Sequence, residues 1–125
     1  MDVTEKLRRL KNVAMVDEFL ESLVSKLGIM FASPEEDIIT QDEESFDMFF
    51  VTFGDCIVNI RDRFKEEQYC VRLITEGGHF GEISAIYQCP RTATVISRTY
   101  TTFAVLGDSH FREVMREFPE YQRQL

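Results

Sequence analysis

The segment from Gly77 to Val95 has the sequence GGHFGEISAIYQCPRTATV and combines three glycines with an acid and a base. Glycine has no β-carbon, so Gly77, Gly78 and Gly81 allow tight turns and let the backbone come close to a ligand. A helical turn that starts at Gly81 would leave free N–H groups at its N-terminus, where phosphate groups are commonly bound. The segment therefore predicts a backbone cradle for an anion.

Two charged side chains complement this cradle. Arg91 carries a planar fork of donors that can bind two phosphate oxygens at once. The ionised carboxylate of Glu82 accepts hydrogen bonds from hydroxyl groups. An exposed Arg–Glu ion pair contributes only about 0–1 kcal/mol to stability. A surface pair would therefore be weak evidence for a function by itself. Within one glycine-rich segment, the two residues instead predict a site for a sugar phosphate.

FGEIS at residues 80–84 and RTAT at residues 91–94 resemble the phosphate-binding cassette of cyclic nucleotide-binding domains, which occur in cAMP- and cGMP-regulated channels, kinases and bacterial regulators. The resemblance extends over most of the chain. SPEEDII at residues 33–39 resembles the P-G-D-x-I turn of the family, with Glu35 where glycine is usual. FREVMREFPEYQRQL at residues 111–125 resembles the helix that follows the barrel in the ion-channel branch.

The resemblance assigns roles to the cassette. It implies that Glu82 binds the ribose hydroxyl, that Arg91 binds phosphate, and that backbone groups of neighbouring residues meet the ligand. Thr92 lies where many cGMP-responsive members of the family place a threonine that reaches guanine or phosphate. Channels that respond mainly to cAMP carry it as well, so Thr92 permits cGMP without demonstrating a preference. The cassette residues expected at the ligand are Gly81, Glu82, Ile83, Ser84, Arg91, Thr92 and Ala93.

Contacts to the base are expected from inward-facing positions on two strands, Cys56–Ile60 and Tyr69–Ile74. Arg72 stands out among the apolar residues of the second strand. A shift of one residue in register would exchange the inward and outward faces, so the direction of Arg72 is open. The expected base contacts are Val58, Val71 and Leu73, with Ile74 as a further candidate.

From Ile29 to Leu106 the sequence consists of short runs of β-branched and aromatic residues separated by polar turns. This pattern predicts a mainly β domain, a sandwich or jelly roll, rather than a parallel α/β sheet. The family resemblance narrows it to an antiparallel β-roll (double-stranded β-helix) with flanking helices. Gly54-Asp55 is expected to form a tight hairpin turn. The acidic segment 42–45 lacks the spacing of a calcium loop and is expected to be a solvated loop.

The helical lead-in is expected to occupy residues 1–27. Apolar residues recur at helical spacing in its first half, and the better interpretation of that stripe is packing within the domain. A second helix is expected to start at Asp17 and to end at Gly28, as helices commonly do at glycine.

The β-roll is expected to span residues 28–107, with the cassette at 77–95. Residues 108–125 follow it and are expected to hold a helix from His110 to Glu117, capped by Asp108 or Ser109. In the resembling family a long final helix closes over the base as a lid, and this chain would contain only the start of that helix.

Composition excludes several classes of function. The chain has 14 basic and 22 acidic residues and a net charge of −8, which repels nucleic acids and anionic membranes. Its 3 cysteines have no C-x-x-C spacing, which argues against a disulfide framework and a zinc site. No apolar run approaches the roughly 20 residues of a membrane span, and no signal peptide is evident, so direct membrane insertion of this segment is not expected.

The expected function is that of a cytoplasmic regulatory domain. It would bind a cyclic purine nucleotide (cAMP or cGMP) and couple binding to helix movement. The preferred parent is a cation (potassium) channel in the membrane, which would supply the rest of the chain and a homo-tetrameric assembly. A regulatory subunit of a cyclic nucleotide-dependent kinase is the second choice. The nucleotide is the expected ligand. No cofactor, catalytic residue or metal-binding residue is expected.

Two other classes remain as alternatives. The same barrel could serve as a non-binding assembly or scaffold domain, but the presence of both Glu82 and Arg91 argues against this. A metal-dependent enzyme of the cupin type would need a cluster of histidines and carboxylates, and the chain has 2 histidines outside any H-x-H pattern. Ser84 lacks the G-x-S-x-G surroundings of a nucleophile. The chain is therefore expected not to be an enzyme.

Overall fold

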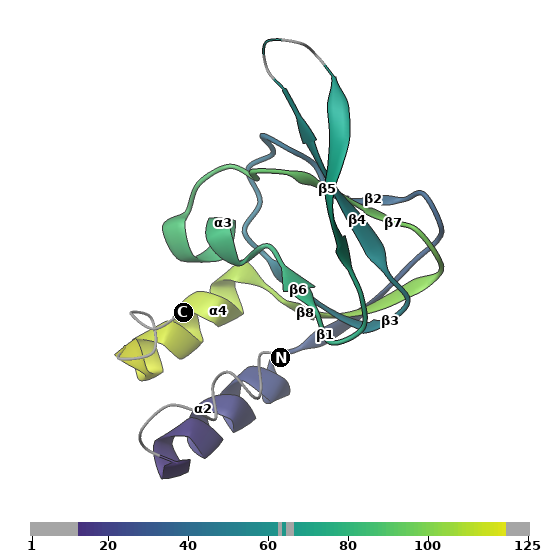
Figure 1. Cartoon of the computed structure of the whole chain (residues 1–125). Coiled ribbons are helices and arrows are strands. Elements are labelled where there is room, and N and C mark those ends of the chain that lie inside the picture. The colour runs from purple at the N-terminus through teal and green to yellow at the C-terminus, as the bar shows by residue number, and fades with distance from the viewer. Residues whose placement is uncertain (1–12, 63, 65–66, 120–125) are drawn as a thin grey trace.

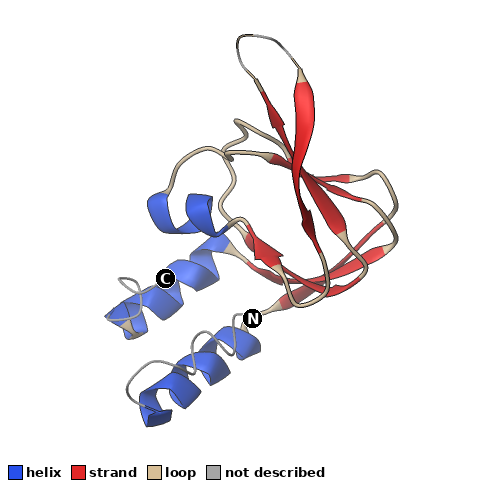
Figure 2. Cartoon of the chain, in the orientation of Figure 1, coloured by secondary structure: helices blue, strands red, loops and turns tan. Residues whose placement is uncertain are grey.

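The computed structural model describes residues 13–62, 64 and 67–119, which form two antiparallel sheets flanked by helices (Figure 1). The helices gather on one side of the strands (Figure 2). The helices are α2 (Val13–Ser25), α3 (Glu82–Tyr87) and α4 (Asp108–Glu117). The strands are β1 (Gly28–Ala32), β2 (Asp37–Ile39), β3 (Met48–Phe53), β4 (Cys56–Arg61), β5 (Gln68–Ile74), β6 (His79–Phe80), β7 (Thr94–Ser97) and β8 (Thr101–Leu106).

The two sheets each contain four strands, in the orders β1-β8-β3-β6 and β2-β7-β4-β5. All strand pairs are antiparallel. Buried side chains alternate with more exposed ones along strands such as β4 and β8, so each sheet turns one face inward. The inner faces meet in one core that includes Val51 and Phe103 from the first sheet and Val58 and Val95 from the second. The expected antiparallel β-roll with flanking helices is confirmed.

Three phenylalanines organise the end of the core next to the cassette. The rings of Phe49 and Phe80 stack with centroids 5.0 Å apart. Phe103 meets both rings edge to face, at 5.9 Å from Phe49 and 5.8 Å from Phe80. Such ring pairs contribute about 0.5–1.5 kcal/mol beyond the area that they bury. They fix the short strand β6, from which the cassette begins.

A second apolar cluster joins the helices to the first sheet. Phe19 of α2 is fully buried against residues of α4, and its ring lies 5.3 Å from that of Phe118. Val114 of α4, Leu106 of β8 and Ala85 of α3 belong to the same cluster. The position of α4 is therefore tied both to the sheet and to the cassette helix α3.

Helix boundaries differ from the expectation at three points. Helix α2 already covers Val13, four residues before the expected start at Asp17. Gly28 does not end it with a left-handed residue, because Gly28 is the first residue of β1 and pairs with Val105. Helix α4 begins at Asp108, two residues before the expected start. The apolar stripe of residues 3–10 and the expected lid start at 120–125 lie outside the described residues.

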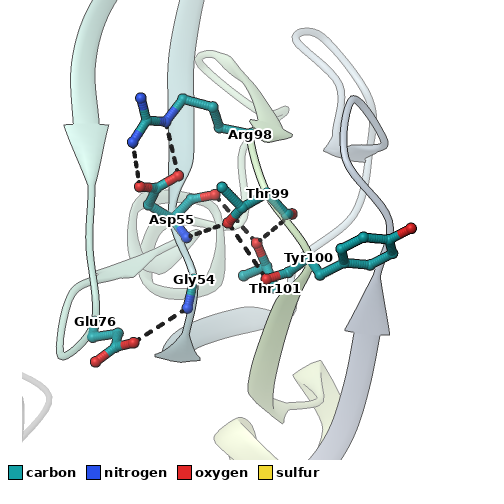
Figure 3. A network of polar contacts seen from close by, with 7 residues as sticks. All are labelled: Gly54, Asp55, Glu76, Arg98, Thr99, Tyr100 and Thr101. Atoms are coloured by element: carbon teal, nitrogen blue, oxygen red, sulfur yellow. Dashed lines mark hydrogen bonds and ion pairs between the residues drawn. The ribbon is translucent and has the colours of Figure 1, made fainter.

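The predicted hairpin at Gly54-Asp55 is wrong, because β3 and β4 belong to different sheets. The link is a corner that carries the chain from one sheet to the other, and Figure 3 shows the polar contacts around it. Gly54 has φ +84°, and a β-carbon there would lie 2.5 Å from the carbonyl oxygen of Tyr100. Asp55 forms a two-point ion pair with Arg98, with N–O distances of 2.9 and 2.6 Å. The corner is thus anchored to the turn between β7 and β8.

All three cysteines carry free thiols, in agreement with the absence of a disulfide pattern. Cys56 lies in the core, and burial raises the pKa of its thiol to about 11. Among the described residues, no helix has the length and apolar character needed to cross a membrane.

The turn between β1 and β2 keeps a left-handed residue although it lacks glycine. Glu35 has φ +65°. Its N–H donates to the carbonyl oxygen of Ser97 at 2.7 Å, and the Ser97 N–H donates to the carbonyl oxygen of Glu36 at 2.9 Å. The buried hydroxyl of Ser97 adds a bond to the carbonyl oxygen of Ser33. These bonds hold Glu35 in a conformation that costs a residue with a β-carbon about 1–2 kcal/mol.

We expect Glu35→Gly to raise the free energy of unfolding by about 0.5–1 kcal/mol. The change removes the left-handed strain, and the greater freedom of glycine in the unfolded chain cancels part of the gain. Urea denaturation followed by circular dichroism measures the difference. Glu44→Gly is the matched control, since it removes the same charge at an exposed residue without positive φ. Equal effects of the two substitutions would contradict strain at Glu35.

Candidate functional site

A cavity of about 290 Å³ lies between the cassette and the strands of the second sheet. All the expected ligand-binding residues except Leu73 line it: Gly81, Glu82, Ile83, Ser84, Arg91, Thr92, Ala93, Val58 and Val71. Its other lining residues are Ile39, Ile60, Arg72, Phe80 and Val95. The cavity thus has polar and charged groups on the cassette side and mainly apolar groups on the strand side.

The cassette turns sharply at Gly81, between β6 and α3. Gly81 has φ +90°, which favours glycine. A β-carbon there would lie 2.6 Å from the carbonyl oxygen of Asp47 and 3.0 Å from Nη1 of Arg91. Only glycine lets these three groups come together. Glu82, at the start of α3, and the buried Ser84 then face the cavity from the first turn of this helix.

The Arg91 side chain is 2% exposed and is held by three oxygen atoms. Its Nε donates to Oγ of Ser45 at 2.9 Å, and its Nη2 donates to the carbonyl oxygen of Asp47 at 2.8 Å. Its Nη1 donates to the carbonyl oxygen of Gly81 at 3.2 Å. A guanidinium has five N–H groups, so one on each terminal nitrogen is left for a ligand. Burial lowers the pKa of Arg91, while the charges of Asp47 and Glu43 raise it. An arginine remains protonated in proteins, so the group presents a fixed positive charge.

The acidic segment 42–45 does more than form a solvated loop. Its side chains at 42–44 are exposed, but its backbone holds Arg91 on both sides. The Arg91 N–H donates to the carbonyl oxygen of Glu43 at 2.9 Å, and the Asp42 N–H donates to the carbonyl oxygen of Arg91 at 2.8 Å. The Ser45 hydroxyl that accepts from Arg91 donates in turn to Oε1 of Glu43 at 2.8 Å. The sequence carries no local signal for these contacts, because the loop lies more than forty residues before Arg91.

Glu82 lines the same cavity without a partner. Within the part of the chain that the structure describes, its carboxylate makes no hydrogen bond or ion pair. Arg91 and Glu82 are therefore not paired with each other. Both carboxylate oxygens of Glu82 are available to accept hydrogen bonds from a ligand.

A bulge in β5 changes which residues of that strand face the cavity. Val58 of β4 pairs with Arg72, and the next residue, Asn59, pairs with Cys70, so Val71 is the extra residue. A bulge lets two successive residues oppose one partner residue and redirects their side chains. Val71 and Arg72 both line the cavity as a result.

The expectation for Leu73 is therefore corrected. Leu73 pairs with Ile57, is 48% exposed and lies outside the cavity lining. Strict alternation from Val71 would have turned it inward. Ile74, the further candidate, is buried in the core and also lies outside the lining.

Asp47 connects this site to helix α4. Its carbonyl oxygen accepts from Arg91, while its side-chain Oδ1 accepts from the backbone N–H of Asp108 at 2.9 Å. Asp108 is the first residue of α4, and no side chain of the residue before it caps the helix. The capping group expected at Asp108 or Ser109 is thus supplied by Asp47, sixty-one residues earlier in the chain.

Comparison with known proteins gives a consistent result. A family model described as the cyclic nucleotide-binding domain matches residues 30–118. The potassium channel AKT2 of Oryza sativa subsp. japonica is 33% identical over 103 residues, which is 82% of this chain and 12% of the channel. The human potassium/sodium hyperpolarization-activated cyclic nucleotide-gated channel 1 is 29% identical over 105 residues, which is 84% of this chain and 11% of the channel. The chain therefore spans about a tenth of the length of these relatives.

Solved structures share the fold. The catabolite activator protein of Thermus thermophilus matches with a TM-score of 0.74 and 18% identity, covering 91% of this chain and 51% of the other. The regulatory subunit of a cAMP-independent protein kinase A from Trypanosoma brucei matches with a TM-score of 0.75 and 21% identity, covering 98% of this chain and 43% of the other. These matches show the fold, and the family model, which covers the cassette and most of both sheets, shows that the chain belongs to the cyclic nucleotide-binding domain family.

Proposed function

We propose that this chain is a regulatory domain that binds a cyclic purine nucleotide, cAMP or cGMP, in the 290 Å³ cavity. The proposal rests on how the protein holds two charged side chains of the cavity, Arg91 and Glu82. Arg91 is buried and fixed, with N–H groups left over, and Glu82 faces the same cavity without a partner. A buried cation and an unpaired acceptor suit a ligand that combines a phosphate with a ribose hydroxyl.

The binding energy must come from both sides of the cavity. A hydrogen bond to a charged group contributes about 1.5–3 kcal/mol, whereas micromolar affinity corresponds to about −8 kcal/mol. Four such bonds from Arg91 and Glu82 would sum to about 6–12 kcal/mol, but association itself costs about 4–15 kcal/mol, so further contacts are needed. Packing of the purine against Val58, Val71 and Ile83 supplies apolar contact, at roughly 25 cal/mol for each Å² removed from water. The net charge of −8 repels the ligand at a distance, so the contacts within the cavity decide affinity.

Binding would be passed on as movement of α4. Asp47 bonds Arg91 through its main chain and the start of α4 through its side chain. An open groove of about 810 Å³ between α3 and α4, lined by Ile86, Phe111 and Met115 among others, leaves space for α4 to shift toward the cassette. A ligand that binds one position of α4 better than another shifts the population toward it.

The parent that fits best is a cation channel of the membrane, with this domain on the cytoplasmic side and a tetramer formed through the channel. The support is the similarity to two kinds of potassium-conducting channel over more than four fifths of this chain. A kinase regulatory subunit is the second candidate, supported by a structural match over nearly the whole chain. A non-binding scaffold is disfavoured by the unpaired Glu82, which contributes nothing visible to the fold.

We expect Glu82→Gln to weaken nucleotide binding at least tenfold, or about 1.4 kcal/mol, without changing the stability of the domain. Among the described residues the carboxylate has no hydrogen-bond or ion-pair partner, so the fold loses no such bond. Isothermal titration calorimetry suits the measurement, since the chain has no tryptophan to report binding by fluorescence. Glu44→Gln, an exposed carboxylate outside the cavity, is the matched control. Full affinity in Glu82→Gln would contradict its role at the ribose.

Arg91→Lys tests the phosphate site while keeping the charge. Lysine cannot reproduce the planar fork, so we expect a loss of affinity of tenfold or more together with a loss of stability, because the oxygens of Ser45, Asp47 and Gly81 lose donors. Circular dichroism establishes that the variant is folded before titration. Arg98→Lys serves as the control at the far corner. Wild-type affinity in a folded Arg91→Lys variant would contradict the proposal.

We expect Asp47→Ala to uncouple α4 from the site. The carbonyl oxygen that accepts from Arg91 remains, so affinity should fall less than threefold, whereas loss of the cap on α4 costs about 0.5–2 kcal/mol of stability. Hydrogen exchange of the α4 amides, with and without nucleotide, measures the coupling. Asp47→Asn keeps an acceptor at Oδ1 and should restore most of the ligand response. An unchanged response of α4 in Asp47→Ala would rule out this route.

A further inference from the structure

We propose that the corner between the two sheets carries a docking surface for a partner protein, which binds there through a basic, arginine-containing segment. This corner surface consists of the exposed aromatic residues Phe31, Phe53 and Tyr100 and of the acidic turns beside them. None of these three aromatic residues lines the nucleotide cavity, so the inference stands apart from the proposed function.

The aromatic part of the corner surface extends into solvent. Phe31 of β1 and Phe53 of β3 both lie opposite Thr102 of β8, and residues opposite each other in a sheet share a face. Their side chains are 76% and 60% exposed. Tyr100 lies just before β8 and is 71% exposed, and its ring extends away from the polar network of the corner (Figure 3). Large apolar side chains that gather on one exposed face are typical of an interaction surface.

A hollow of about 540 Å³ lies at the end of this face. Phe53 and Tyr100 contribute its aromatic walls, and Glu76 contributes a carboxylate. Oε1 of Glu76 accepts a long hydrogen bond, 3.4 Å from the backbone nitrogen of Gly54, and the carboxylate forms no ion pair with the described residues. A planar guanidinium pairs with carboxylates and also stacks on aromatic rings. An arginine side chain therefore matches both kinds of wall.

The charges around the hollow favour a basic partner. Hydrogen bonds between the turns bring acidic residues together, because the backbone of Glu35 bonds that of Ser97 and the backbone of Arg98 bonds that of Asp55. In the turns at 33–37, 54–55, 75–78 and 98–100 the only base is Arg98, which Asp55 already neutralises. The acids of these turns are Glu35, Glu36, Asp37, Asp55 and Glu76. Complementary charge steers association, whereas a second copy of this chain would bring the same negative charge and be repelled.

The corner is held in place by the fold. The Asp55 N–H donates to Oγ1 of Thr99 at 3.3 Å, and Oγ1 of Thr101 donates to the carbonyl oxygen of Asp55 at 3.2 Å. Together with the Asp55–Arg98 ion pair, these bonds fix the backbone on both sides of Tyr100. A surface that is ordered before association loses less conformational entropy when a partner binds.

Fluorescence anisotropy of labelled peptides, titrated with the whole chain, tests the inference. The probe is a short helical peptide of leucine, alanine and arginine in which arginine recurs at every fourth position. Two matched peptides carry lysine or glutamate at the same positions. We expect the arginine peptide to bind at least tenfold more tightly than the glutamate peptide. The lysine peptide should bind several fold more weakly than the arginine peptide, because an ammonium group lacks the planar fork that stacks on rings.

Two substitutions locate the contact on the chain. Tyr100→Ser removes an exposed ring, and Glu76→Gln removes the charge while keeping an acceptor for the Gly54 N–H. We expect each to weaken binding of the arginine peptide at least fivefold. Tyr87→Ser and Glu44→Gln are the matched controls, since they change an exposed ring and an exposed carboxylate outside the corner surface. Each control should change the affinity less than twofold.

Three results would overturn the inference. Equal binding of the three peptides would show apolar adhesion without charge recognition. Equal loss in the corner variants and their controls would show attraction to the acidic chain as a whole. Binding to phosphatidylcholine vesicles that Tyr100→Ser abolishes, without binding of any peptide, would replace the protein partner by a lipid surface. Because these titrations contain no nucleotide, failure of the proposed nucleotide site would leave their outcome unchanged.

Discussion

The buried guanidinium of Arg91 is the constraint on which the other features of the site depend. A charge that is 2% exposed is stabilised only when hydrogen bonds replace the water that it has lost. The oxygens of Ser45, Asp47 and Gly81 provide those bonds, and they come from two separate loops. The loop before β3, the turn after β6 and the approach to β7 must therefore assemble together. Because Arg91 is part of what holds these loops, its position is set by the fold itself.

The charged groups of the cavity divide into those used by the fold and those left unpaired. Arg91 is satisfied by the protein and keeps spare donors, while Glu82 and Arg72 have no partner within the described residues. The fold therefore draws on Arg91, but on neither of the last two, for hydrogen bonds or ion pairs among the described residues. The acidic loop contributes as well, because the charges of Asp47 and Glu43 oppose the effect of burial on the pKa of Arg91. An overall negative chain thus contains a buried positive charge at the cavity.

Asp47 contacts both Arg91 and the start of α4. Its main chain bonds Arg91 and its side chain caps α4, while its carbonyl oxygen leaves no space for a β-carbon at residue 81. A displacement of Arg91 by ligand would be felt at the first residue of α4 through a single residue. The groove between α3 and α4 and the shared apolar cluster lie on the two sides of the helix that such a displacement would involve.

The sequence by itself determined the fold class, the cassette and most of the cavity lining, because these depend on local features. Glycine at 81 meets the need for positive φ, and alternating apolar runs form the inward faces of strands. The same local logic predicted a hairpin at Gly54, where the real link joins two sheets, since a glycine turn does not reveal which strands will pair. It also placed Leu73 in the cavity by strict alternation.

Tertiary structure alone decided the partners of Arg91, the cap of α4 and the direction of Arg72. Ser45 and Asp47 lie more than forty residues from Arg91 in the sequence, and nothing local to either segment indicates their contact. The bulge at Val71 arises from the pairing of β5 with β4 and reverses the face of each residue after it. Pairing between distant segments is a property of the folded chain, so the residues that complete this site became visible only in three dimensions.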